Sequence, residues 1–167
     1  LIVTFQDDSE NIFYGVLDII VSGNSLKATS IDVLGSTNDI FNPGELLNFK
    51  IELQNSGSTN AFNINGTITC ASPFVEILDN YGEWTSVLSW GSSHSETNYF
   101  EITTLEETIP GAVAHLIVNV ETEDGYVSNS IVPIQIGEPT INDPVGPDAH
   151  GYYIYDSDDI DYILAPT

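Results

Sequence analysis

The chain has 167 residues, 41% of them hydrophobic, and 25 acidic against 2 basic side chains (histidine excluded) give a formal net charge of −23. The apolar content is enough for a core and argues against global disorder, while the charge disfavours nucleic acid and anionic membranes as partners. The single cysteine, Cys70, excludes an internal disulfide framework.

No apolar run reaches the length of a transmembrane helix. The sequence opens on Leu1 without a basic-then-apolar signal segment. We therefore expect a soluble, surface-exposed protein that is a mature product or a part of a longer polypeptide, and we expect no membrane insertion.

Two segments of the chain resemble each other. Residues 1–23 read LIVTFQDDSENIFYGVLDIIVSG, and residues 116–137 read LIVNVETEDGYVSNSIVPIQIG. Both open with Leu-Ile-Val, pass through an acidic turn and end in an alternating strand and a glycine. The offset of 115 residues is the length of an immunoglobulin-like module. We therefore predict that residues 1–23 are the C-terminal hairpin of a preceding repeat.

An isolated hairpin is marginally stable in water, so we expect residues 1–23 to be covered. The cover is either the rest of their own module or a neighbouring chain. In the second case a strand would be donated between identical subunits.

Residues 24–137 are predicted to form one complete module of short strands. Residues 46–54 show the pattern best, because Leu47, Phe49, Ile51 and Leu53 alternate with polar residues after an Asn-Pro-Gly turn. The other predicted strands are residues 26–34, 62–70, 74–78, 84–90, 99–103, 114–120 and 127–136. No helical periodicity is present, and the pattern predicts an all-β, immunoglobulin-like Greek-key β-sandwich.

Two residues predict local detail within these strands. Gly66 is expected to mark a β-bulge in a strand that turns Phe62, Ile64 and Ile68 towards the core. Pro133 is expected to place the last strand at the edge of its sheet, because proline cannot donate a ladder hydrogen bond.

Residues 138–167 change in composition. The Pro-rich EPTINDPVGP reads as a linker, and HGYYIYDSDDIDYILAPT is predicted to begin a following β segment. We expect the 150–167 tail and the 1–23 hairpin to contact neighbouring repeats or identical subunits.

Four short motifs give the module a family resemblance: Asn42–Glu45, Asn55–Gly57, Pro73–Ile77 and Asp124–Tyr126. With them it resembles the immunoglobulin-like accessory repeats of large secreted bacterial proteins, akin to the cell-adhesion-related domain found in bacteria. The tail GPDAHGYYIYD resembles segments of gingipain-like secreted proteins. The resemblance implies a non-catalytic, extracellular spacer or adhesion module.

The tail also contains the best metal-ligand candidates, Asp156, Asp158, Asp159 and Asp161. Closely spaced carboxylates in a loop can converge on Ca²⁺, which takes six to eight oxygen ligands. A solvated acidic loop is the alternative. Calcium is the one cofactor that the sequence suggests.

The sequence predicts no catalytic residue. The histidines His94, His115 and His150 lack zinc-binding spacing, and Cys70 lies within a predicted strand, away from any activating motif. Asn65-Gly66-Thr67 is a glycosylation sequon, so Asn65 is a candidate glycosylation site.

Four aromatic residues, Trp84, Trp90, Tyr81 and Tyr99, either pack in the core and turns or form a platform for a sugar. Together the patterns predict a non-catalytic extracellular structural or adhesion module. Two alternatives stay open. One is a filament subunit held by strand donation, and the other is a calcium-dependent ligand- or carbohydrate-binding accessory domain of a secreted hydrolase.

Overall fold

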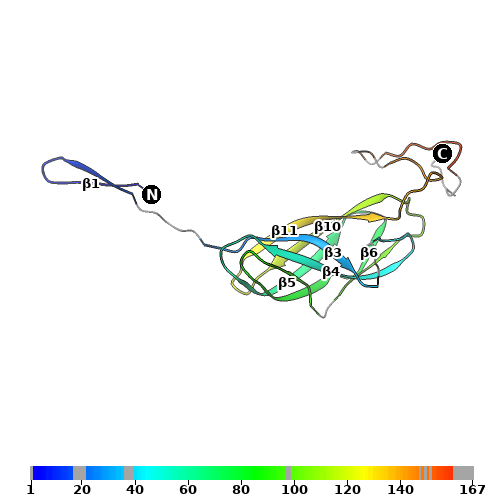
Figure 1. Ribbon diagram of the computed structural model, residues 1–167, viewed down its shortest axis with the longest axis horizontal. Coiled ribbons are helices and arrows are strands. Elements are labelled where there is room, and N and C mark those ends of the chain that lie inside the picture. Colours follow the sequence, from blue (N-terminus) through cyan, green and yellow to red (C-terminus); the bar gives the residue numbers. More distant parts are fainter. Residues whose placement is uncertain are drawn as a thin grey trace.

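The computed structural model describes residues 2–16, 22–35, 40–96, 99–146, 148, 150 and 152–159. Within these residues the secondary structure is β-strands without a helix. Two sheets pack face to face in a sandwich, and a separate two-stranded sheet stands away from it (Figure 1). The predicted all-β sandwich is confirmed.

The sandwich consists of a four-stranded and a five-stranded sheet. The four-stranded sheet has the order β11 (Val127–Ile136), β10 (Ala112–Glu121), β5 (Ala61–Cys70) and β7 (Tyr81–Val87). The other has the order β3 (Leu26–Val33), β4 (Leu46–Asn55), β9 (Phe100–Thr104) and β6 (Val75–Asp79), and β8 (Ser92–His94) pairs with β4. The pairings β4–β9 and β10–β5 are non-consecutive, as a Greek-key arrangement requires.

The core lies between the sheets and follows the alternation seen in the sequence. In β10 every second residue is buried, and in β4 Phe49, Ile51 and Leu53 are fully buried. The neighbours of these residues point to the outer faces. Strand β11, which contains Pro133, lies at the edge of its sheet, as predicted.

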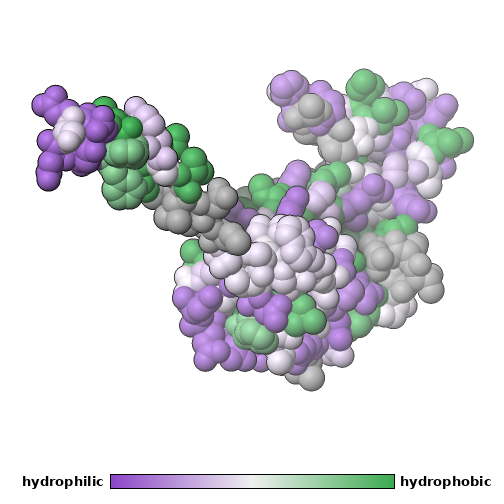
Figure 2. Space-filling model, turned by 60° about the vertical axis from the view of Figure 1, so that its left-hand side comes forward, coloured by the Kyte–Doolittle hydropathy of each residue, from purple (hydrophilic) through white to green (hydrophobic). Residues whose placement is uncertain are grey.

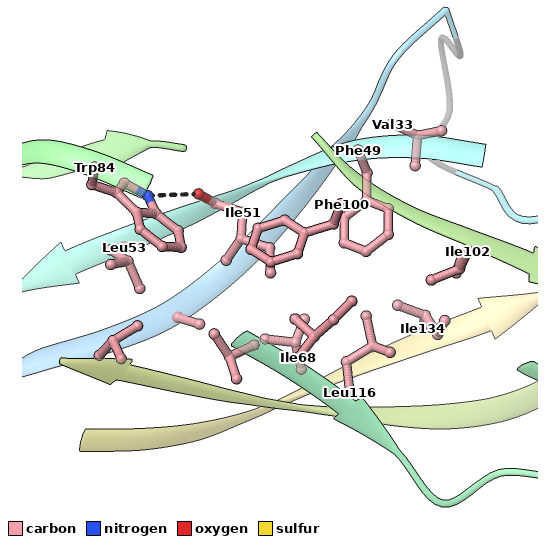
Figure 3. Close-up of a cluster of buried hydrophobic side chains, with 14 of the residues drawn as sticks. Val33, Phe49, Ile51, Leu53, Ile68, Trp84, Phe100, Ile102, Leu116 and Ile134 are labelled. Carbon is pink, nitrogen blue, oxygen red and sulfur yellow. Dashed lines mark hydrogen bonds between the residues drawn. The ribbon is translucent and has the colours of Figure 1, made fainter. Parts of the chain in front are cut away.

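Two glycines make room for the largest rings of the core. Gly66 of β5 and Gly82 of β7 are cross-strand partners. A Cβ atom on Gly66 would lie 2.6 Å from the Trp84 ring, and one on Gly82 would collide with the Phe100 ring. Trp84 is 1% exposed, and its Nε1–H donates to the Ile51 carbonyl oxygen at 3.1 Å (Figure 3).

The β5–β7 ladder is interrupted at Asn63, which has φ of 46°, but the register does not shift. Phe62 pairs with Ser86 and Ile64 pairs with Trp84, so one residue on each strand lies between these pairs. The inward alternation of the strand breaks there, and Phe62 points outwards and is 51% exposed. The predictions of an inward Phe62 and of a bulge at Gly66 are wrong, because Gly66 stays in regular register beneath Trp84.

The sequence did not reveal β8 or the junction between β6 and β7. Strand β6 runs to Asp79 and β7 begins at Tyr81, so the chain changes sheets at Asn80, within the interval between the predicted strands 74–78 and 84–90. The Asn80 carbonyl accepts a hydrogen bond from Ile68 N–H at 2.9 Å. The polar sequence of β8 carries no apolar alternation that could identify it.

The glycine pair yields a test of the core. Gly82→Ala forces the Phe100 ring to move, so we expect the free energy of unfolding to fall by about 1–3 kcal/mol, as overpacking usually costs. Urea denaturation followed by Trp fluorescence measures it. Gly23→Ala is the matched control, since its Cβ would meet no atom within 4 Å. Equal effects of the two substitutions would contradict this account.

Candidate interaction surfaces

The separate sheet is a hairpin of β1 (Ile2–Gln6) and β2 (Ile12–Val16). Its register runs from Ile2 opposite Val16 to Gln6 opposite Ile12. Within the described residues these two strands pair only with each other. The predicted hairpin therefore exists as a distinct element.

A single carboxylate organises the hairpin turn. Asp7 Oδ1 accepts hydrogen bonds from the N–H groups of Ser9 and Asn11, each at 2.9 Å, and Oδ2 accepts from Asn11 Nδ2 at 3.0 Å. The hydrogen bond from the Asn11 side chain is the main cause that lowers the pKa of Asp7. The ionised form of Asp7 is therefore the form that stabilises the turn.

Both strands of the hairpin expose large apolar side chains, and Figure 2 shows hydrophobic surface (green) along the side of the hairpin that faces the viewer. Six of these side chains are more than half exposed: Ile2, Phe5, Ile12, Phe13, Tyr14 and Val16. Figure 1 shows the hairpin projecting from one end of the sandwich, opposite the end that carries the C-terminal tail. A projecting apolar ribbon of this kind is a candidate interaction surface.

A second candidate surface is a shallow hollow of about 390 Å³ on the outer face of the four-stranded sheet. Its lining residues come from three neighbouring strands: Asn65, Gly66, Thr67, Asn119, Val120, Glu121, Val127, Ser128 and Asn129. Asn119 and Asn129 are cross-strand partners, and in the part of the chain described here their side chains make no hydrogen bond. Their amide groups are free to bind a polar ligand.

Asn65 lies at the rim of this hollow and is exposed. Tyr81 Oη lies 2.8 Å from Asn65 Oδ1 and 2.7 Å from Glu83 Oε1. The hydrogen bond to Glu83 raises the pKa of Tyr81. Glycosylation of Asn65 stays a prediction, for which the exposed side chain is available.

The tail carboxylates bind backbone amides of their own loop. Asp159 Oδ2 accepts from Asp156 N–H at 2.6 Å, and Asp156 Oδ1 accepts from Asp158 N–H at 2.7 Å. Asp161, the fourth predicted ligand, lies outside the described residues. Among the residues that are described, no three His, Cys, Asp or Glu side chains form a group that could hold a metal ion. The calcium site stays a prediction.

The aromatic platform does not form as a unit, because Trp84 is buried in the core whereas Trp90 is 76% exposed. Tyr99 lies beneath the Lys50 ammonium group, 5.5 Å from ring centroid to Nζ. Neither tryptophan lines the polar hollow. A sugar platform built from all four aromatic residues is therefore wrong.

The other reactive side chains are dispersed. His94 belongs to the five-stranded sheet and His115 to the four-stranded sheet. Cys70 is half-buried at the end of β5, opposite Leu116 of β10. Across the described ranges, no helix is long and apolar enough to span a membrane.

Together the fold and these surfaces define a β-sandwich module with an exposed accessory hairpin. No family model matches the sequence, and no curated protein matches it. Among solved structures, the chain is similar to the cell-adhesion-related (CARDB) domain of a Pyrococcus furiosus protein, described as a complex with di-metal ions. The identity is 12%, the TM-score is 0.39, and the match covers 73% of this chain and 94% of that domain. The tail's resemblance to gingipain-like proteins stays a prediction.

The Asp7 turn predicts an acid-sensitive hairpin. Because its pKa is lowered in the folded hairpin, the stabilising effect of Asp7 is present above the pKa of the unfolded chain and is lost as the pH falls through the folded value. We expect the amide chemical shifts of β1 and β2 to move towards random-coil values in acid. Asp7→Ala should produce the same shift at neutral pH, whereas Asp8→Ala, which removes a neighbouring carboxylate, should not. NMR titration measures both, and an acid transition unchanged by Asp7→Ala would contradict the assignment.

Proposed function

We propose that this chain is a non-catalytic structural module that spaces neighbouring parts of an extracellular bacterial protein. The observation that supports this most is the position of the two ends of the sandwich. The chain enters β3 at one end and leaves β11 at the other (Figure 1). A module of this kind lengthens an array in line, without folding it back.

The first and last strands of the sandwich lie side by side and run in the same direction. Ser128 Oγ donates to the Leu26 carbonyl oxygen at 2.7 Å, and Ala28 N–H donates to Ser130 Oγ at 3.0 Å. Further along, Phe41 forms a parallel bridge to Ile136. Tension applied through the two ends therefore pulls parallel strands past each other. The hydrogen bonds between them then share the force instead of opening one at a time.

The charge of the chain supports the same use. With a net charge of −23, copies repel each other and resist non-specific association. Salt or bound cations would relieve this repulsion. The surface therefore suits a module that works in contact with salt-containing surroundings.

Ligand or carbohydrate binding is a second candidate function, and the polar hollow supports it. The paired amides of Asn119 and Asn129 offer donors and acceptors to the hydroxyl groups of a neutral sugar. A glycan array with the intact chain should show binding that Asn119→Ala with Asn129→Ala abolishes. An absence of binding to any glycan would remove this candidate.

Single-molecule pulling through the chain ends tests the spacer function. We expect one cooperative rupture that releases roughly 350 Å of new contour length, the extended length of residues 26–136 less the length of the folded sandwich. Ser128→Ala with Ser130→Ala should lower the rupture force, because it removes the hydroxyl bonds between β3 and β11. Ser86→Ala is the control on β7, away from the pulled strands. Unfolding without a force peak would contradict the proposal.

A further inference from the structure

The exposed hairpin and the last hairpin of the sandwich have the same strand register at a spacing of 115 residues. In β1–β2 the partners are Ile2↔Val16, Val3↔Gly15, Thr4↔Tyr14, Phe5↔Phe13 and Gln6↔Ile12. In β10–β11 they are Ile117↔Ile131, Val118↔Ser130, Asn119↔Asn129, Val120↔Ser128 and Glu121↔Val127. Each residue of the first set lies 115 positions before its counterpart in the second.

The turns of the two hairpins also match. Equivalent backbone bonds close them, from Asp7 N–H to Asn11 O at 3.1 Å and from Thr122 N–H to Tyr126 O at 2.9 Å. Glu10 has φ of 66°, and its counterpart Gly125 has φ of 81°. A positive φ is rare for glutamate. Because Glu10 nevertheless has the same backbone conformation as Gly125, the turns of the two hairpins have the same backbone geometry.

We propose that β1–β2 is the closing hairpin of a second β-sandwich. Its partner is a sandwich of this same architecture that lacks its own β10–β11 hairpin, so that β1–β2 can take the position of that hairpin. The inference rests on the proposed function, in which the module has neighbours in an array. It goes further, because it names the partner and the contact surface.

The match identifies the face of the hairpin that becomes buried. Val118 and Val120 point into the core and are 1% and 5% exposed. Their counterparts are Val3 and Phe5, and Phe5 is 61% exposed. In the second sandwich Val3 and Phe5 therefore face inwards, while Thr4 faces the solvent as Asn119 does.

The match also identifies the strand that β1 would pair with. Strand β10 lies between β11 and β5, with Val118 opposite Ile68 and Val120 opposite Gly66. One edge of β1 pairs with β2, and its other edge is unpaired within the described residues. This other edge corresponds to the edge of β10 that pairs with β5. In the partner, an open strand equivalent to β5 would take up these unpaired backbone groups.

One difference separates the two hairpins. Ser128 and Ser130 join β11 to β3 through their hydroxyl groups, whereas the equivalent residues are Phe13 and Gly15. The second sandwich therefore lacks these hydroxyl bonds. It gains the apolar surface of Phe13, which is 56% exposed in the free hairpin.

An intact second copy of this chain does not fit as the partner. In every copy β10–β11 already occupies the position that β1–β2 would take, and the pairing with β5 is complete. Strand donation between intact copies would have to displace that hairpin.

A tandem protein tests the inference with the complete chain. Residues 24–115 are placed directly before Leu1, so that His115 precedes Leu1 as it precedes Leu116. We expect the added block to fold with β1–β2 and about double the calorimetric enthalpy of unfolding, since enthalpy scales with the number of folded residues.

The register control uses residues 24–114 in place of residues 24–115. The one-residue shift turns every side chain of the hairpin to the other face, and the gain in enthalpy should be lost. Within the matched tandem, Phe5→Asp should also abolish the gain, whereas Thr4→Asp should keep it. In the natural chain Phe5→Asp should leave the unfolding of the sandwich unchanged.

A matched tandem without the additional enthalpy would overturn the inference, as would equal results for the two registers. A version with Phe5→Val and Phe13→Ser separates poor packing from a wrong partner. If only this version folds, the backbone match is sufficient but the natural hairpin does not fit, and the inference also fails. The pulling experiment on the natural chain does not depend on these outcomes. A failed tandem experiment would therefore contradict the assignment of the hairpin without contradicting the spacer function.

Discussion

The hydrogen bond from the Trp84 indole to the Ile51 carbonyl joins the two sheets of the sandwich. Trp84 belongs to β7 of one sheet and Ile51 to β4 of the other. The same carbonyl accepts the N–H of Ser95 at 2.9 Å, so both of its lone pairs are used within the core. A buried indole N–H left unpaired would cost about 1–3 kcal/mol, so this contact fixes the position of the indole. This position of the Trp84 ring leaves no room for a side chain at residue 66, and the neighbouring Phe100 ring leaves none at residue 82. Both positions are therefore glycine.

The sequence predicts those parts of the fold that depend on alternation. Strands β4, β10 and β11 alternate over ten residues each, and their burial agrees with the pattern. Strand β8 could not be found, because Ser-Ser-His forms a strand only where the edge of β4 is available. The interruption of the ladder at Asn63 could not be found either, because it breaks the alternation of Phe62 and Ile64 without shifting their register against Ser86 and Trp84. Properties that arise from the contact between distant segments leave no periodic signal in either segment alone.

The same distinction applies to the interaction surfaces. The two Leu-Ile-Val segments reveal the hairpin repeat in the sequence, because equal spacing in both strands implies equal register. The polar hollow gives no such signal, since it arises where Asn119 and Asn129 meet across two strands. The spacing of the tail carboxylates predicts a calcium loop, which stays a prediction. In the structure the carboxylates of Asp156 and Asp159 accept hydrogen bonds from backbone amides of their own loop, and the sequence does not reveal these bonds.

The energetics of the free hairpin favour a permanent contact with the proposed second sandwich over a transient one. Burying Val3, Phe5 and Phe13 contributes about 1.5–3 kcal/mol for each side chain. This sum is an upper estimate, and it is comparable to the 5–15 kcal/mol that stabilises a typical domain. A contact of that size is part of a fold rather than a transient encounter. The hairpin and its partner sandwich would therefore fold together, and the array would be held by shared cores, with the strongly acidic surfaces kept apart in water.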